Sequence, residues 1–91
     1  MAEGKYQEAI AEYKLAAQFN PELEGVYYNL GRAQAKLSLF DDAIASYRKE
    51  LDAIGGDYDV EMALASAYDA KGMKKEAADA RQKAADLTGK K

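Results

Sequence analysis

Several residue types that carry chemistry are missing from this chain of 91 residues. It has no cysteine, which excludes a disulfide framework and a thiolate metal site. It has no histidine, so the commonest general base and the commonest metal ligand are both absent. No apolar run approaches the roughly 18 residues of a membrane-spanning helix. We therefore expect no membrane insertion.

Proline is rare and the charge is nearly balanced. Pro21 is the only proline, while alanine, leucine, glutamate and lysine abound, a composition typical of helical proteins. The formal net charge is −3, with both signs interspersed. A nucleic-acid-binding surface would be basic, so we expect no nucleic-acid partner.

One segment recurs at a fixed spacing. Phe40–Tyr47 reads FDDAIASY, and its relatives YQEAIAEY and KKEAADAR lie 34 residues before it and 34 residues after it. The alanine at the centre of each segment keeps this spacing: Ala9, Ala43 and Ala77. A constant period of this size indicates a protein built from stacked repeats.

Apolar residues at three- and four-residue spacing predict five helices. We place these helices at about Lys5–Phe19, Pro21–Leu37, Phe40–Ala53, Tyr58–Lys71 and Met73–Leu87. Asn20 and Pro21 should end the first helix and start the second, and Asp57 should cap the fourth. Connections this short require that neighbouring helices run antiparallel.

The three units share further residues at matching places. Small residues should let helices approach closely, and larger apolar residues should fill the space around them. The middle unit carries Tyr27, Leu30-Gly31, Ala43, Tyr47 and Gly55, and the last carries Leu64-Ala65, Tyr68, Gly72, Ala77 and Ala84. The first unit has only its second half: Gly4, Ala9, Tyr13, Ala16 and Pro21. In this pattern the chain resembles the tetratricopeptide repeat (TPR) family over nearly its whole length.

The resemblance implies an all-α fold, an α-solenoid of antiparallel helical hairpins that forms a right-handed superhelix. We expect one array over residues 1–91, with a half repeat at about 1–23 and repeats at about 24–57 and 58–91. Gly4, Ser38 and Gly72 would each lie in the tight turn before the second helix of their unit. The last helix is polar, with Lys74 and Arg81 in place of aromatic residues, and we interpret it as a C-terminal cap.

The first helix has no partner helix before it in the sequence. The chain is therefore expected to be a piece of a longer array, or a protomer that covers its open end with another copy. On the second hypothesis it would form a homo-oligomer through the apolar residues of the first helix: Tyr6, Ile10 and Tyr13.

The resemblance also implies a binding site for a protein or peptide, in the concave groove lined by the first helix of each hairpin. Tyr28, Arg32 and Lys36 lie off the apolar stripe, and an aromatic ring beside two cations suits an acidic or C-terminal carboxylate segment. An ordinary solvated helix face is the alternative interpretation. The full set of candidate groove residues is Tyr28, Asn29, Arg32, Lys36, Asp59, Met62, Ser66 and Asp69.

No set of residues predicts catalysis, a cofactor or a metal. Asp57, Asp59 and Glu61 form an acidic cluster, which an acidic helix start explains better than a calcium loop. No nucleophile, base and oxyanion site come together in the sequence. The leading prediction is therefore a non-enzymatic scaffold for protein–protein interaction. The alternatives are an assembly module that stacks on copies of itself and a regulatory domain of a larger enzyme.

Overall fold

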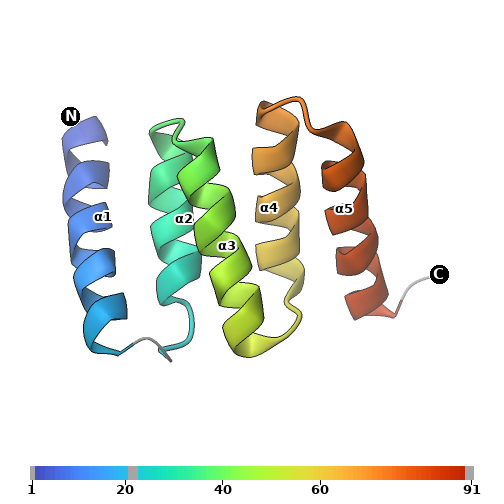
Figure 1. Ribbon diagram of the computed structural model, residues 1–91, viewed down its shortest axis with the longest axis horizontal. Coiled ribbons are helices and arrows are strands. Elements are labelled where there is room, and N and C mark those ends of the chain that lie inside the picture. Colours follow the sequence, from blue (N-terminus) through green and yellow to red (C-terminus); the bar gives the residue numbers. More distant parts are fainter. Residues whose placement is uncertain (1, 21–22, 90–91) are drawn as a thin grey trace.

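The chain folds into α-helices throughout the part that the computed structural model describes, residues 2–20 and 23–89. These residues form five helices: α1 (Ala2–Phe19), α2 (Val26–Lys36), α3 (Phe40–Ile54), α4 (Tyr58–Ala70) and α5 (Lys74–Thr88) (Figure 1). The described ranges contain no β-strand. The prediction of an all-α fold with five helices is confirmed.

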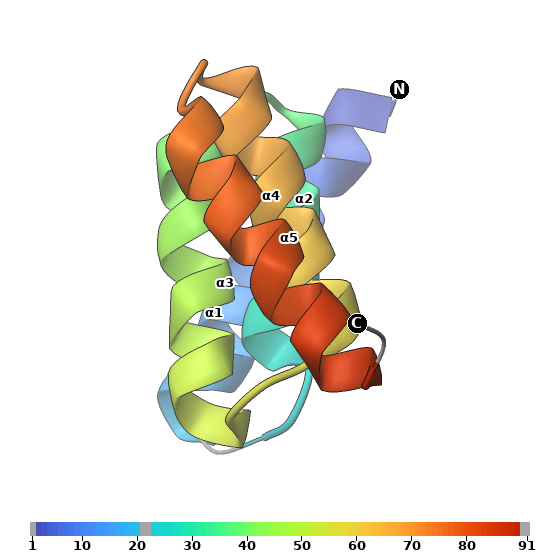
Figure 2. The ribbon, with the colours of Figure 1, turned by 90° about the vertical axis from the view of Figure 1, so that its right-hand side faces the viewer.

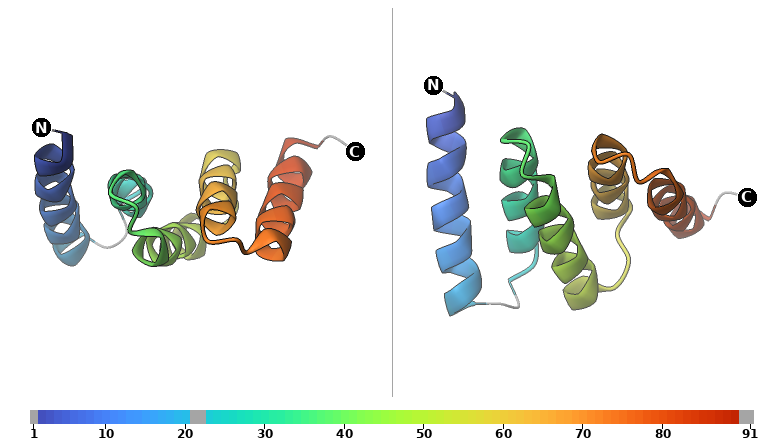
Figure 3. Two further views of the ribbon diagram at one scale, coloured as in Figure 1. Left: turned by 90° about the horizontal axis from the view of Figure 1, so that it is seen from above. Right: turned by 45° about the horizontal axis from the view of Figure 1, so that its top comes forward.

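Successive helices run antiparallel and each packs against its neighbour in the chain, as Figure 1 shows. In addition α2 contacts α4, so these two first helices of successive hairpins lie on one side of α3 (Figure 3). Among the described elements α1 packs only on α2, and α5 packs only on α4. Figure 2 shows α5 lying across the C-terminal end of the array with its outer side uncovered. The predicted solenoid of helical hairpins is thus confirmed.

Small residues occupy the places where the helices come closest. Ala43, Ala65 and Ala77 are 0% exposed. A Cβ atom added to Gly31 would lie 2.5 Å from Cε1 of Tyr47, so α2 can approach this buried ring only because residue 31 is glycine. In an interface packed this closely, the addition of a single methyl group is enough to disturb the packing.

The start of α2 differs from the prediction. Leu23, Glu24 and Gly25 precede the helix, and Gly25 has a φ of 91°, a left-handed conformation that favours glycine. The predicted start at Pro21 lies outside the described residues, but a helix through residues 23–25 is wrong. A sequence-local cap at Asn20 therefore cannot serve α2.

The cap of α2 comes from another helix. Glu50 of α3 is 1% exposed, and its Oε2 accepts a hydrogen bond from the backbone N–H of Gly25 at 2.7 Å. Its Oε1 accepts from the N–H groups of Tyr27 and Tyr28 at 3.2 and 3.3 Å. A carboxylate at a helix N-terminus satisfies donors that have no partner within the helix and meets the positive end of the helix dipole.

Two further boundary predictions can be compared with the structure. Asp57 caps α4 as predicted, because its Oδ2 accepts from the N–H of Val60 at 3.2 Å. Ser38 and Gly72 occupy matching turns with positive φ of 62° and 77°. Gly4 was expected in the same kind of turn, and this is wrong, since α1 begins at Ala2 and runs through Gly4. A single glycine costs a helix only about 1 kcal/mol, which the good helix formers around it can offset.

Candidate functional site

A cavity of about 390 Å³ lies between α2 and α4, and we call it the α2–α4 groove. Phe40 and Tyr47 of α3 contribute to its lining. Four of the predicted binding residues line it: Tyr28, Arg32, Lys36 and Ser66. The small side chains of Ala35, Ala63 and Ala67 leave the space open between them.

The charge of the α2–α4 groove comes from two cations beside aromatic rings. The guanidinium carbon of Arg32 lies 5.7 Å from the centre of the Tyr28 ring, within cation–π range. The rings of Tyr28 and Tyr47 are tilted against each other, with centroids 6.0 Å apart. Burial, and to a lesser degree Tyr28, raises the pKa of Tyr47 to about 12, although Arg32 opposes the shift. Tyr47 therefore stays neutral as part of the wall.

The other predicted residues are not brought into this groove. Asn29 lines a separate cavity beside α1, and neither Asp59 nor Met62 is among the residues that line the α2–α4 groove. Asp69 forms an ion pair with Arg81 of α5. The carboxylate of Asp69 is therefore paired within the last hairpin.

The predicted self-association residues lie beside a smaller cavity of about 190 Å³, the α1–α2 groove. Tyr6, Ala9 and Tyr13 of α1 line it, together with Asn29 and Arg32 of α2. These α1 residues match Phe40, Ala43 and Tyr47 one repeat later. The α1–α2 groove is therefore the counterpart of the α2–α4 groove, without a helix in the place that α2 takes there. Ile10 is partly buried but is not part of its lining.

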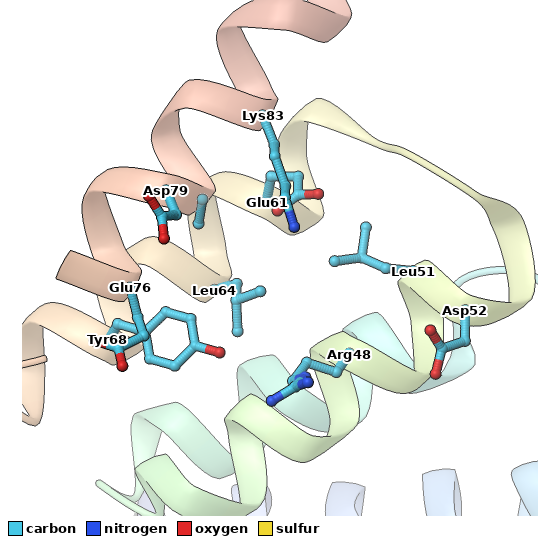
Figure 4. Close-up of a pocket in the computed structure, with 10 residues that line it drawn as sticks. Arg48, Leu51, Asp52, Glu61, Leu64, Tyr68, Glu76, Asp79 and Lys83 are labelled. Carbon is cyan, nitrogen blue, oxygen red and sulfur yellow. The ribbon is translucent and has the colours of Figure 1, made fainter.

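Two cavities on the other side of the array were not predicted. The α3–α5 groove has a volume of about 410 Å³, and the α1–α3 groove one of about 380 Å³. Leu64 of α4 lies in the middle of the first, with Leu51 of α3 pointing toward it (Figure 4). Leu30 of α2 holds the matching place in the second.

The α3–α5 groove is rich in carboxylates. Four of them line it, against two cations, Arg48 and Lys83: Asp52, Glu61, Glu76 and Asp79. Figure 4 shows Lys83 reaching from α5 toward Glu61 of α4. Glu61 is 6% exposed, and burial raises its pKa, while the charge of Lys83 acts in the opposite direction.

Glu61 is a sequence signal for this groove that becomes visible only when the repeats are compared with one another. By its position along the chain, Glu61 is part of an acidic helix start. Its match one repeat earlier is Tyr27, one of the larger residues expected to fill the space between helices, so a carboxylate stands where the repeat pattern has an aromatic ring. A comparison of the repeats at that one place would have marked Glu61 as unusual.

Two features are absent from the part of the chain that the structure describes. Within it no group of three or more Asp or Glu side chains is placed to hold a metal ion. None of its helices is long and apolar enough to cross a membrane.

Comparisons with known proteins agree on one family. A model described as TPR repeat matches residues 1–38, and one described as Tetratricopeptide repeat matches residues 24–53. A structure of MamA from MSR-1 has a TM-score of 0.90 and 32% identity over 93% of this chain and 49% of its own. For MamA from AMB-1 the values are 0.88 and 31%, over 94% and 47%. The chain thus spans about half the length of these proteins. A comparison with curated protein sequences returns no match.

Proposed function

Because the chain belongs to the tetratricopeptide repeat family, whose members are generally non-catalytic scaffolds with protein partners, we propose that it binds a segment of a partner protein in the α2–α4 groove. The observation that carries this proposal is the meeting of Tyr28, Arg32 and Lys36 in one cavity of about 390 Å³. Two cations beside an aromatic wall favour a segment with an acidic side chain or a free C-terminal carboxylate.

The geometry of the groove supports a specific division of roles. Arg32 and Lys36 are exposed and would pair with the carboxylate, while Tyr28 and Tyr47 would pack against an apolar side chain of the segment. Ser66 on the opposite wall can donate or accept one hydrogen bond. The role proposed here is binding alone, with no catalytic site, cofactor, metal or nucleic-acid partner.

A charge reversal tests the proposal. The double variant Arg32→Glu, Lys36→Glu should lose at least tenfold in affinity for acidic peptides with a free C-terminal carboxylate, selected from a peptide library against the wild-type chain. The control is Lys74→Glu, Lys75→Glu, which makes the same charge change at the exposed start of α5, where acidic residues suit the helix dipole. Circular dichroism should show unchanged helicity in both variants. Equal affinity of the groove variant and the control would remove the site assignment.

A second candidate function is assembly through α1. It is favoured by the exposure of Ala9, which is only partly buried although Ala43 and Ala77 at the matching places are 0% exposed. A helix from another copy that packs on Tyr6 and Tyr13 would cover this face. Sedimentation equilibrium at high protein concentration should then show oligomers. Tyr6→Glu with Tyr13→Glu should abolish them, and Tyr58→Glu, at a tyrosine that is already 46% exposed, should not. A wild-type chain that stays monomeric would reject this function.

A further inference from the structure

We propose that the α3–α5 groove is a second binding site, which takes a lysine or arginine side chain of a partner protein. It lies on the side of the array opposite the α2–α4 groove, since α3 and α5 are the second helices of their hairpins. The proposal stands independently of the function assigned to the α2–α4 groove, because the two cavities share no lining residue.

The α3–α5 groove and the α1–α3 groove are the same structure one repeat apart. Every residue that lines the first has its counterpart 34 positions earlier lining the second. Leu64 corresponds to Leu30, Ala80 to Ser46, and Lys83 to Lys49. The two cavities also differ little in volume, at about 410 and about 380 Å³. The second groove therefore serves as an internal reference for the first.

The two grooves differ in charge. The α1–α3 groove is lined by Lys14 and Lys49 against a single carboxylate, Asp42. In the α3–α5 groove the counterpart of Asp42 is Glu76, and three further carboxylates take the places of uncharged residues: Asp52 for Gln18, Glu61 for Tyr27 and Asp79 for Ala45. Four carboxylates therefore face two cations. An incoming cation would be attracted to the α3–α5 groove and not to the α1–α3 groove.

A buried carboxylate distinguishes this groove from an ordinary acidic surface. Glu61 is 6% exposed, and no hydrogen-bond donor among the described residues reaches its carboxylate, on which only the charge of Lys83 from α5 acts. Tyr27, at the matching place, instead carries the Lys49 ammonium 5.5 Å above its ring. Burial removes part of the hydration of this carboxylate and raises its pKa, and a cation that donates hydrogen bonds to it would offset that cost. Figure 4 shows Glu61 beside the open cavity.

The shape of the groove selects the kind of cation. Leu51, Leu64 and the ring of Tyr68 provide an apolar floor beneath the carboxylates. The long aliphatic stem of lysine or arginine packs on such a floor while its charged head reaches the acidic groups. A small hydrated metal ion would leave the floor uncovered.

A titration followed by amide NMR of the 91-residue chain tests the proposal. The probe is the peptide N-acetyl-Leu-Lys-Leu-amide, and its reference is the same peptide with norleucine, which keeps the stem but lacks the charge. We expect millimolar binding of the lysine peptide, with shifts at the amides of Leu51, Glu61 and Lys83 and none around Tyr27. The norleucine peptide should bind at least fivefold more weakly.

Variants assign the binding to the carboxylates. Glu61→Gln keeps the size of the side chain and should weaken the lysine peptide at least fivefold while leaving the chain no less stable to heat. Asp52→Gln with Asp79→Ala installs the residues of the reference groove at two exposed positions and should have a similar effect. Glu12→Gln on α1 is the control and should change nothing. Equal binding of both peptides, equal shifts in the two grooves, unchanged affinity in the variants, or no shifts at all would each overturn the proposal.

Discussion

At the scale of single residues, the alanine at the centre of the recurring segment is fully buried in two units and only partly buried in the first, because its surroundings differ. Ala43 is enclosed between α3 and its neighbours at 0% exposure, whereas Ala9 at the matching place of α1 is only partly buried. The local sequence around the two residues is nearly the same. The difference comes from the helix that covers one and not the other.

Ala43→Leu should therefore destabilise the fold by about 1–3 kcal/mol, because three added carbons have no space in a closely packed interface. Ala9→Leu should change the free energy of unfolding by no more than about 0.5 kcal/mol, since its side chain can extend into the α1–α2 groove. Urea unfolding followed by circular dichroism measures both. Equal costs for the two variants would mean that Ala9 is covered as fully as Ala43.

A second residue-scale prediction concerns Tyr47 and alkaline pH. Its pKa is raised from 10.0 to about 12, mainly by burial and then by Tyr28, with Arg32 acting in the opposite direction. Below pH 10 the tyrosine is neutral in both the folded and the unfolded chain. Between pH 10 and about 12 only the unfolded chain releases the proton, so stability falls with rising pH by up to roughly 2–3 kcal/mol.

Urea unfolding near pH 9 and near pH 12 measures this loss. Tyr47→Phe removes the titrating group and should reduce the pH dependence, whereas Tyr58→Phe, at an exposed tyrosine, should leave it unchanged. A pH dependence that is the same in the two variants would contradict the role given to Tyr47.

At the scale of helices, the N-terminus of α2 depends on α3. Glu50 accepts three backbone hydrogen bonds from the start of α2, and the residues at its matching places are Ala16 and Ala84. Glu50→Ala should cost about 2–3 kcal/mol, because it leaves these donors without a partner and removes a charge from the helix end. Glu50→Gln keeps one acceptor oxygen and should cost about 1 kcal/mol.

Hydrogen exchange locates the effect of Glu50. The amides of Val26 to Asn29 should exchange faster in Glu50→Ala than in the wild type, by more than the amides of α4. Asp57→Ala removes a cap of ordinary, sequence-local type and should instead affect the first turn of α4. Uniform acceleration along the chain in the Glu50 variant would show that its effect is global and not a matter of capping.

The start of α2 shows what the sequence could and could not predict. The period of 34 residues and the apolar stripes were enough for the five helices, their antiparallel order and the repeat family. The start of α2 was missed because its cap comes from a residue 25 positions later, and only the fold brings the two together. The sequence did predict Tyr28, Arg32 and Lys36 as neighbours, because they follow one another at four-residue spacing along one helix. It could not show that Asp69 pairs with Arg81 or that Asn29 faces α1.

At the scale of the whole molecule, each helix packs mainly on its neighbours in sequence, and the five helices do not surround one common core. α1 packs on α2 alone and α5 on α4 alone among the described helices, while α2, α3 and α4 each have further neighbours. In an array of this kind stability comes from each unit and from its interfaces with the next. We expect hydrogen exchange to be slowest in α3 and α4 and at least about tenfold faster in α1 and α5. Equal protection of all five helices would indicate that the chain opens only as one cooperative unit.

The two outer grooves offer a route to changing specificity. Their floors are set by Leu30 and Leu64, which belong to the hydrophobic interior, whereas Asp52 and Asp79 on the rim are exposed. The exposed residues of one groove could therefore be introduced into the other by substitutions at the corresponding positions, without repacking the interior. The array would then carry two acidic sockets, spaced by one hairpin, for a partner with two basic residues.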